Sequence, residues 1–216
     1  MNTSQKTKRL AVSAIMLASA VILAVLSAPI PPLPFGGSFT VASMLPIVLI
    51  AYMYGTKWGI LTAFTYSVLQ MLISFNTVQA FFLPDNENYM GNVGFALLIC
   101  IIDYVIAYTA LGFGGIFRKV IKNQTVALIL GVIFALSLRY IAHIISGYIF
   151  FGAWAEWFFS QDGLGIIGEW TLGTFSGNGL SLFYSVFYNG LYMIPEILIT
   201  SLVDIPVSRI PYVKKY

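Results

Sequence analysis

The first part of the chain contains no charged residue between Leu10 and Thr56. Such a run suits a lipid environment, because a helix needs about 20 mostly apolar residues to cross the hydrocarbon core of a membrane. The whole chain agrees, since 9% of its 216 residues are charged and 59% are hydrophobic, whereas soluble domains carry about 25% charged residues. We therefore expect an integral membrane protein, which excludes a soluble enzyme, a nucleic-acid-binding protein and a disordered chain.

Apolar stretches of suitable length predict six membrane-spanning helices. The first two are separated by a proline and glycine cluster between Pro29 and Gly37, because proline lacks a backbone donor and glycine favours turns. The predicted helices cover about 10–28, 40–54, 58–75, 93–113, 125–150 and 180–205. Residues 76–92 are polar and 151–179 are rich in glycine and tryptophan, so both are expected to be loops. The prediction is an all-α, six-helix bundle that forms a single membrane domain over residues 1–216.

The basic residues predict how the chain is oriented, because short loops that carry lysine and arginine stay in the cytoplasm. Of the eleven lysines and arginines, all but Arg139 flank the predicted helices at one side of the membrane: Lys6, Lys8, Arg9, Lys57, Arg118, Lys119, Lys122, Arg209, Lys214 and Lys215. The other three loops contain only acidic charges. We therefore place both termini in the cytoplasm. Cleavage of residues 1–28 as a signal peptide is not expected, since it would move the basic C-terminus across the membrane.

Ionisable side chains within membrane helices are costly and are candidates for function by default. Four stand out clearly in the predicted helices, namely Asp103, Arg139, His143 and Glu196. Arg139 and His143 are four residues apart and therefore share one helix face. Asp103 is expected near mid-depth, and His143 and Asn189 towards the outer face. The external loops above them contain three tryptophans that would supply aromatic walls, Trp154, Trp157 and Trp170.

These residues also have structural interpretations. Arg139 would pair with a carboxylate and lock two helices together, and Asn189 would join helices by hydrogen bonding. Tyr184 and Tyr188 would belong to an interfacial aromatic belt. Asp103 is the hardest to explain in this way, because a carboxylate at mid-depth needs a cation, a proton or water. Its expected partner is Arg139 or a cationic ligand.

The chain lacks the groups that catalysis or ATP hydrolysis would need. A single cysteine, Cys100, and a single histidine, His143, exclude a disulfide framework and a histidine metal cluster, so neither a metal site nor a cofactor is expected. Gly55-Thr56-Lys57 lacks the rest of a phosphate-binding loop. A carboxylate, a histidine, an amide and aromatic rings suit a flat cationic or polar heterocycle, with cation–π contacts worth about 0.5–2 kcal/mol each. These residues predict an outward-facing small-molecule binder and not an enzyme.

The first predicted helix carries small residues on one face. The spacing of Ala14 and Ala18 lets another helix approach closely. Its partner would be either another helix of this chain or a helix of a second protein.

Three segments carry a resemblance to a known family. They are Ile102-Asp103-Tyr104-Val105, Leu138-Arg139-Tyr140-Ile141-Ala142-His143-Ile144-Ile145-Ser146-Gly147 and Tyr184-Ser185-Val186-Phe187-Tyr188-Asn189-Gly190. In this order they resemble the thiamine-specific substrate-binding subunits of energy-coupling factor transporters, the ThiT (YuaJ-like) family. The resemblance covers nearly the whole chain and includes the six spans and the Ala14–Ala18 spacing.

The resemblance implies a substrate site. The implied binding residues are Asp103, Tyr104, His143, Phe151, Tyr184 and Asn189. Phe151 stands where some members carry a stacking tryptophan. The first external loop, Pro34-Phe35-Gly36-Gly37-Ser38-Phe39, lacks a tryptophan that some members use in a lid, for which Trp154 or Trp157 would compensate.

The resemblance also implies a substrate and partners. Thiamine carries a permanent thiazolium charge, which would explain Asp103 and the aromatic rings. Uptake would be powered by a transmembrane coupling subunit with two ATP-hydrolysing subunits, docked at Ala14 and Ala18. The expected location is the bacterial plasma membrane. The alternatives are the same type of subunit for riboflavin or a thiamine precursor, and a stand-alone proton-coupled carrier in which Asp103 and His143 form a relay.

Overall fold

The computed structural model describes residues 3–31, 33, 37–86 and 88–214. Pro34, Phe35 and Gly36 of the first external loop, together with Lys215, lie outside the described residues. Every regular element within the described ranges is a helix. The predicted all-α class is therefore confirmed.

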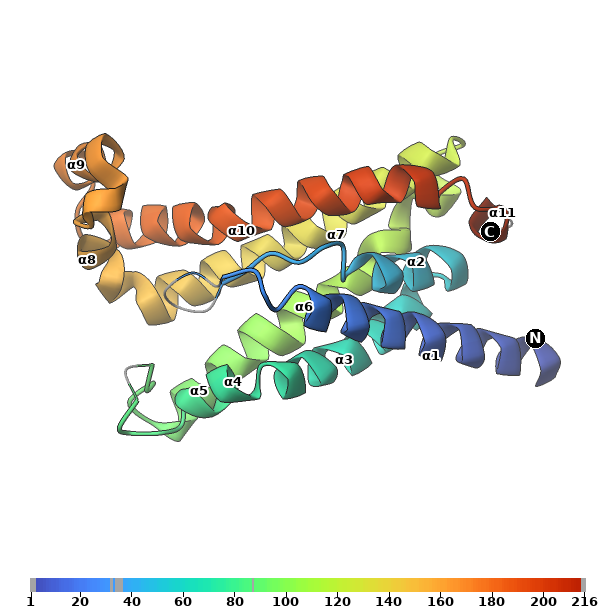
Figure 1. Ribbon diagram of the computed structural model, residues 1–216, viewed down its shortest axis with the longest axis horizontal. Coiled ribbons are helices and arrows are strands. Elements are labelled where there is room, and N and C mark those ends of the chain that lie inside the picture. Colours follow the sequence, from blue (N-terminus) through green and yellow to red (C-terminus); the bar gives the residue numbers. More distant parts are fainter. Residues whose placement is uncertain (1–2, 32, 34–36, 87, 215–216) are drawn as a thin grey trace.

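The described elements form a bundle of long helices with shorter ones at its ends (Figure 1). In chain order they are α1 (Thr3–Leu26), α2 (Leu45–Tyr54), α3 (Thr56–Ile73), α4 (Phe75–Ala80), α5 (Val93–Cys100), η1 (Ile101–Ile106), α6 (Ala107–Thr109), η2 (Ala110–Lys119), α7 (Gln124–Ser146), η3 (Gly147–Phe151), η4 (Gly152–Trp154), α8 (Ala155–Phe159), η5 (Asp162–Leu164), α9 (Gly165–Thr174), α10 (Gly177–Val207) and α11 (Pro211–Lys214). Of these, η1 and η3 are π-helices, and η2, η4 and η5 are 3₁₀-helices.

Four helical stretches among the described residues are long and apolar enough to cross a membrane: Thr3–Leu26, Val93–Lys119, Gln124–Phe159 and Gly177–Val207. The predicted helix over 40–54 is shorter in the structure, because α2 begins at Leu45 with proline in its first turn. Its 10 residues would cover about 15 Å, half of the hydrocarbon core. The 18-residue α3 carries Lys57 and Gln70 and is not one of the four.

The prediction of a long loop over 151–179 is wrong, because α8 and α9 lie within it. These helices have 5 and 10 residues, and the backbone turns at Gly165 and Gly177, where φ is +42° and +52°. Helices this short, bounded by glycines, leave no long apolar pattern in the sequence. The polar stretch 76–92 likewise begins with most of α4.

The centre of the bundle is α2, which is buried over nearly its whole length. Small residues let its neighbours approach closely. A Cβ at Gly112 of η2 would lie 2.5 Å from the Cα of Ile60 in α3, so these two elements pack backbone against backbone. The long helices are thereby held in one compact arrangement.

The two ends of the bundle differ. Both chain ends lie at one end, with the α2–α3 turn and the η2–α7 connection, whereas α8 and α9 lie at the other (Figure 1). We call these the terminal end and the loop end. Hydrogen bonds tie the terminal end together, from Arg118 Nη1 to the Met53 carbonyl at 2.7 Å and from Gln124 Nε2 to the Val213 carbonyl at 2.8 Å. The basic residues predicted to share one side of the membrane belong to segments that meet here.

Candidate functional site

A cavity of about 280 Å³ lies between the helices, in the half of the molecule nearer the loop end. Its lining comes from the end of α1, the connection that follows it, α3, α4, η1, α6, α7, η3 and the first half of α10. Pockets for small organic ligands start at about 300 Å³. The cavity therefore matches a compact ligand.

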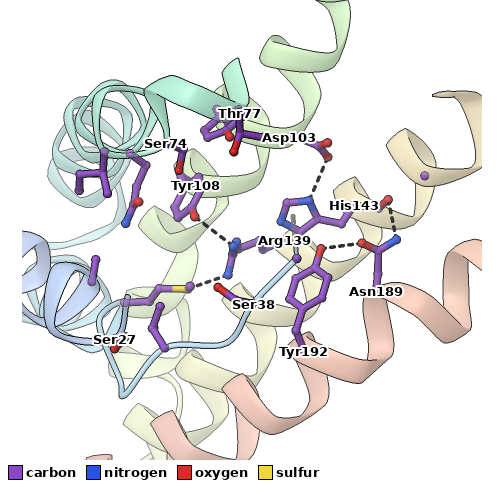
Figure 2. A pocket seen from close by; sticks show the side chains of 18 of the residues that line it. Ser27, Ser38, Ser74, Thr77, Asp103, Tyr108, Arg139, His143, Asn189 and Tyr192 are labelled. Carbon is purple, nitrogen blue, oxygen red and sulfur yellow. Dashed lines mark hydrogen bonds and ion pairs between the residues drawn. The ribbon is translucent and has the colours of Figure 1, made fainter. Parts of the chain in front are cut away.

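All six residues predicted to bind substrate line this one cavity: Asp103, Tyr104, His143, Phe151, Tyr184 and Asn189. They come from η1, α7, η3 and α10, which are far apart in the sequence. Figure 2 shows Asp103, His143 and Asn189 on three neighbouring helices around the same space.

Asp103 is held by His143. The carboxylate Oδ1 lies 2.9 Å from the imidazole Nδ1, and a carboxylate only accepts, so Nδ1 donates. Of the two partners considered for Asp103, Arg139 is thus not the one in the structure, and a cationic ligand stays a prediction. The other ring nitrogen of His143, Nε2, is buried and has no hydrogen-bond partner among the described residues. The pair therefore fixes the imidazole and leaves one nitrogen available to a ligand.

Two π-helical turns shape the cavity. The wider turn of η1 allows Asp103 and Tyr104 to line the cavity together with Tyr108 of the following α6. In η3 the same is true of Gly147 and Phe151. Such turns are rare and occur often at functional sites. Nothing in the apolar composition of these segments signals them.

Arg139 is buried beside the cavity without a carboxylate partner. Its Nη2 donates to the Tyr108 hydroxyl at 3.1 Å, its Nη1 lies 3.0 Å from the Met44 sulfur, and its guanidinium carbon is 4.4 Å from the centre of the Tyr108 ring. Among the described residues no carboxylate reaches ion-pair distance of this guanidinium. The interpretation of Arg139 as half of an interhelical ion pair is therefore wrong, and the ring of Tyr108 takes that place.

Asn189 joins α10 to α7. Its amide nitrogen donates to the carbonyls of His143, at 3.1 Å, and of Ser185, at 2.8 Å, and its amide oxygen accepts from the Tyr192 hydroxyl. A Cβ at Gly147, the first residue of η3, would collide with Ser185 of α10, so η3 and α10 meet closely just beyond the end of α7. Asn189 thus fills the structural role considered for it and also lines the cavity.

Several lining residues were not predicted. Gln70, Tyr108, Tyr188 and Tyr192 also face the cavity, although Tyr188 was assigned to an interfacial belt. The recurrence of tyrosine at every fourth position of α10, from Tyr184 to Tyr192, places these rings on one helix face and was an available signal.

The tryptophans predicted to wall the site do not line the cavity. Trp154, Trp157 and Trp170 are exposed at the loop end. Trp154 and Trp157 stack edge to face on each other with ring centres 6.0 Å apart. The expectation that one of them replaces a missing lid tryptophan is therefore wrong in this structure.

Three buried polar atoms around the cavity have no hydrogen-bond partner among the described residues: His143 Nε2, the Tyr184 hydroxyl and Arg139 Nε. Buried polar groups in proteins are nearly always satisfied, so such a group calls for an explanation. A ligand with polar atoms in the cavity would provide one.

Comparison with known proteins gives this arrangement a context. Residues 10–160 match the family described as "Thiamine transporter protein (Thia_YuaJ)". The chain belongs to this thiamine transporter family. Within it, the chain is 32% identical over 212 residues to the thiamine transporter ThiT of Bacillus subtilis (strain 168), covering 94% of this chain and 91% of that protein.

The fold has a solved counterpart. ThiT from Listeria monocytogenes is 23% identical, with a TM-score of 0.62 over 97% of this chain and 98% of that one. At this identity the likeness establishes the fold alone. The predicted resemblance to the ThiT family is confirmed, and the family consists of transporters rather than enzymes. With its long apolar helices, this family member is a multi-pass bacterial membrane protein.

Proposed function

We propose that this protein captures thiamine in the cavity around Asp103 and His143, as the substrate-binding subunit of an energy-coupling factor importer. The observation that carries the proposal is the convergence of the six predicted residues on one cavity in a member of the thiamine transporter family.

The lining suits the chemistry of thiamine. The thiazolium ring is permanently cationic, and the Asp103 carboxylate supplies a negative charge in the same cavity. Aromatic rings such as Tyr104 and Tyr184 offer faces for cation–π contacts of about 0.5–2 kcal/mol each. The unpartnered His143 Nε2 and Tyr184 hydroxyl are available to the polar atoms of the pyrimidine.

The orientation follows from charge. The segments with basic residues meet at the terminal end, so the positive-inside rule places that end and both chain termini in the cytoplasm. The cavity, in the other half of the molecule, then lies in the outer half of the membrane and receives substrate from outside.

The surface of α1 suits a partner helix. Ser13, Ala20 and Ala24 face the bundle and are buried, whereas Ala14 and Ala18 are exposed. Small exposed residues four apart allow another membrane helix to approach closely. We assign this face to the coupling subunit, and ATP hydrolysis to its two associated subunits.

Binding is tested by titrating the detergent-purified chain with thiamine and following tryptophan fluorescence. Saturable quenching by thiamine and none by riboflavin is expected. Asp103→Ala and His143→Ala should weaken binding at least tenfold, whereas Glu169→Gln, at an exposed loop-end carboxylate, should bind like the parent. If both cavity variants bind thiamine normally, the site assignment fails. Preference for riboflavin or for the pyrimidine moiety alone would change the substrate.

Partner docking is tested by uptake in cells that contain the coupling and ATP-hydrolysing subunits. Ala14→Trp should bind thiamine but lose uptake, while the control Leu198→Trp, on the exposed face of α10, should keep both. Normal uptake by Ala14→Trp would remove α1 from docking. Uptake by the single chain in liposomes, driven by a pH gradient, would instead support the stand-alone carrier.

A further inference from the structure

We infer that the outward face of α9 binds membrane lipid, so that α9 lies in the interface of the outer leaflet and braces the aromatic wall of the cavity. The inference concerns a surface outside the cavity and does not depend on which substrate the cavity takes.

The outward face of α9 is apolar and exposed. Ile166 is 84% exposed, Trp170 54% and Ile167 49%. Only Gly168 and Thr171 of this helix are buried. Large apolar side chains exposed together are unfavourable in water, so this face favours an apolar environment.

The inner face of α9 is firmly seated. A Cβ at Gly168 would collide with the carbonyl of Phe159 in α8, so the two helices touch backbone to backbone. On the outward face, the half-exposed Trp170 ring is also anchored, since it packs edge to face on Phe175 and Phe183 with ring centres 5.7 and 5.9 Å apart. The exposure of its outer face is therefore a property of a well-packed helix beside the start of α10 (Figure 1).

The position of α9 favours lipid as the partner. The 31 residues of α10 span about 46 Å, compared with about 30 Å of hydrocarbon and about 40–45 Å with headgroups. Its first turns, against which α9 packs, therefore reach headgroup level. Leu182 and Val186 in the first turns of α10 are also exposed and apolar.

The composition of the region also favours lipid. Tryptophan concentrates at membrane–water interfaces, and α9 presents Trp170 there. No lysine or arginine occurs between Arg139 and Arg209, so attraction to anionic headgroups plays no part. Burial of apolar area, worth about 25 cal/mol per Å², would instead drive the association, with Glu169 directed to water.

Side-chain contacts through α8 connect α9 to the wall of the cavity. In α8, Phe158 packs edge to face on Tyr184 and Tyr188, with ring centres 5.3 and 5.6 Å apart. Phe159, whose carbonyl meets Gly168, lies 6.5 Å from Tyr184. Both tyrosines line the cavity. The α8 aromatic pair thus stands between the lipid-facing helix and the cavity wall.

The test uses the full chain with Trp170 as its only tryptophan, made by replacing Trp58, Trp154 and Trp157 with phenylalanine. The protein is placed in nanodiscs of phosphatidylcholine brominated either near the carbonyl end of the acyl chain or near its terminal methyl. We expect at least twofold stronger quenching of Trp170 by bromine near the carbonyl end, and weak quenching by acrylamide from water. Strong acrylamide quenching without bromolipid quenching would overturn the proposal.

A second pair of variants, both made in the single-tryptophan chain, tests whether the apolar face of α9 makes the lipid contact. Ile166→Glu in the single-tryptophan chain should reduce bromolipid quenching severalfold, because it charges the lipid face without touching the interior. Gly163→Glu adds the same charge at an exposed position with open space around it and should leave the quenching unchanged. Equal quenching in both variants would overturn the proposal, as would cross-linking between copies through Ile166→Cys that replaces the lipid contact.

Discussion

Two buried carboxylates on α10, one in each half of the molecule, differ in their hydrogen bonding. Glu196 and Asp204 lie about two helical turns apart, and neither has any exposed surface. The Glu196 carboxylate accepts from the backbone N–H of Thr40, from the Thr40 hydroxyl at 3.0 Å and from the Thr200 hydroxyl at 3.3 Å. Both carboxylate oxygens of Asp204 lack a hydrogen-bond partner among the described residues.

The difference follows the position of the cavity. Glu196 holds Thr40, and the segment around Thr40 contributes Gly37 and Ser38 to the cavity lining. The same segment is tied to α1 by a 2.9 Å hydrogen bond from the Val41 N–H to the Ser27 hydroxyl. Asp204 lies beyond the cavity, towards the terminal end. The carboxylate that positions the cavity wall is hydrogen-bonded, whereas the one towards the terminal end has no hydrogen-bond partner among the described residues.

The largest expected effect comes from removing the held carboxylate. Glu196→Ala should lower the free energy of unfolding by about 2–4 kcal/mol, because it removes a buried side chain and takes the acceptor from the backbone N–H of Thr40. Thiamine affinity should fall with it. Glu196→Gln keeps one accepting oxygen and should lose less. Thermal unfolding in detergent and thiamine titration measure both effects, and a parent-like Glu196→Ala would contradict the positioning role.

A smaller effect is expected at Gly37, in the part of the cavity wall that Glu196 positions. A Cβ at Gly37 would lie 2.5 Å from Cε1 of Tyr192, so Gly37→Ala should cost about 1–3 kcal/mol through overpacking. Because Tyr192 lines the cavity and bonds to Asn189, thiamine affinity should fall about tenfold. Gly163→Ala, with open space around it, is the control. Unchanged affinity in Gly37→Ala would show that Tyr192 can move without loss.

A gain in stability is expected at Asp204, the carboxylate without a hydrogen-bond partner among the described residues. Asp204→Asn should raise the free energy of unfolding by about 1–2 kcal/mol, because a neutral amide is less costly to bury than an unpartnered carboxylate. Thiamine affinity should not change, since Asp204 does not line the cavity. The unfolding midpoint in detergent measures the gain. A lower midpoint would mean that the carboxylate is held in solution and that the two acids are alike.

The smallest effect is expected at Thr200, which lies between Glu196 and Asp204 on α10. Thr200 donates only the longest of the hydrogen bonds to Glu196, so Thr200→Val should cost about 0.5–1 kcal/mol. Thiamine affinity should stay within twofold of the parent, since Thr40 still holds the carboxylate. A loss as large as that of Glu196→Ala would show that Thr200, and not Thr40, is the main partner.

Cavity residues could be predicted from the sequence where an ionisable side chain is costly to place in a membrane helix. Asp103 and His143 stand out in apolar runs, and both line the cavity. The partner of Arg139 was not predictable, because it depends on how α7 meets the π-helical turn that precedes Tyr108. Tyr192 was missed because tyrosine is common in membrane helices. The short helices α8 and α9 were missed because neither is long enough to set up a periodic pattern.

The two π-helical turns have a consequence for how such a site diversifies. A π-turn holds more residues than an α-turn, so deleting one residue from η1 would restore an α-helix. The flanking helices α5 and α6 would keep their register, but the side chains within the turn would change direction, so Asp103 and Tyr104 would no longer face the cavity together. Because η3 lines the same cavity, the cavity depends on chain length at two points. Single-residue insertions and deletions, and not only substitutions, are therefore a route to new pocket shapes on this scaffold.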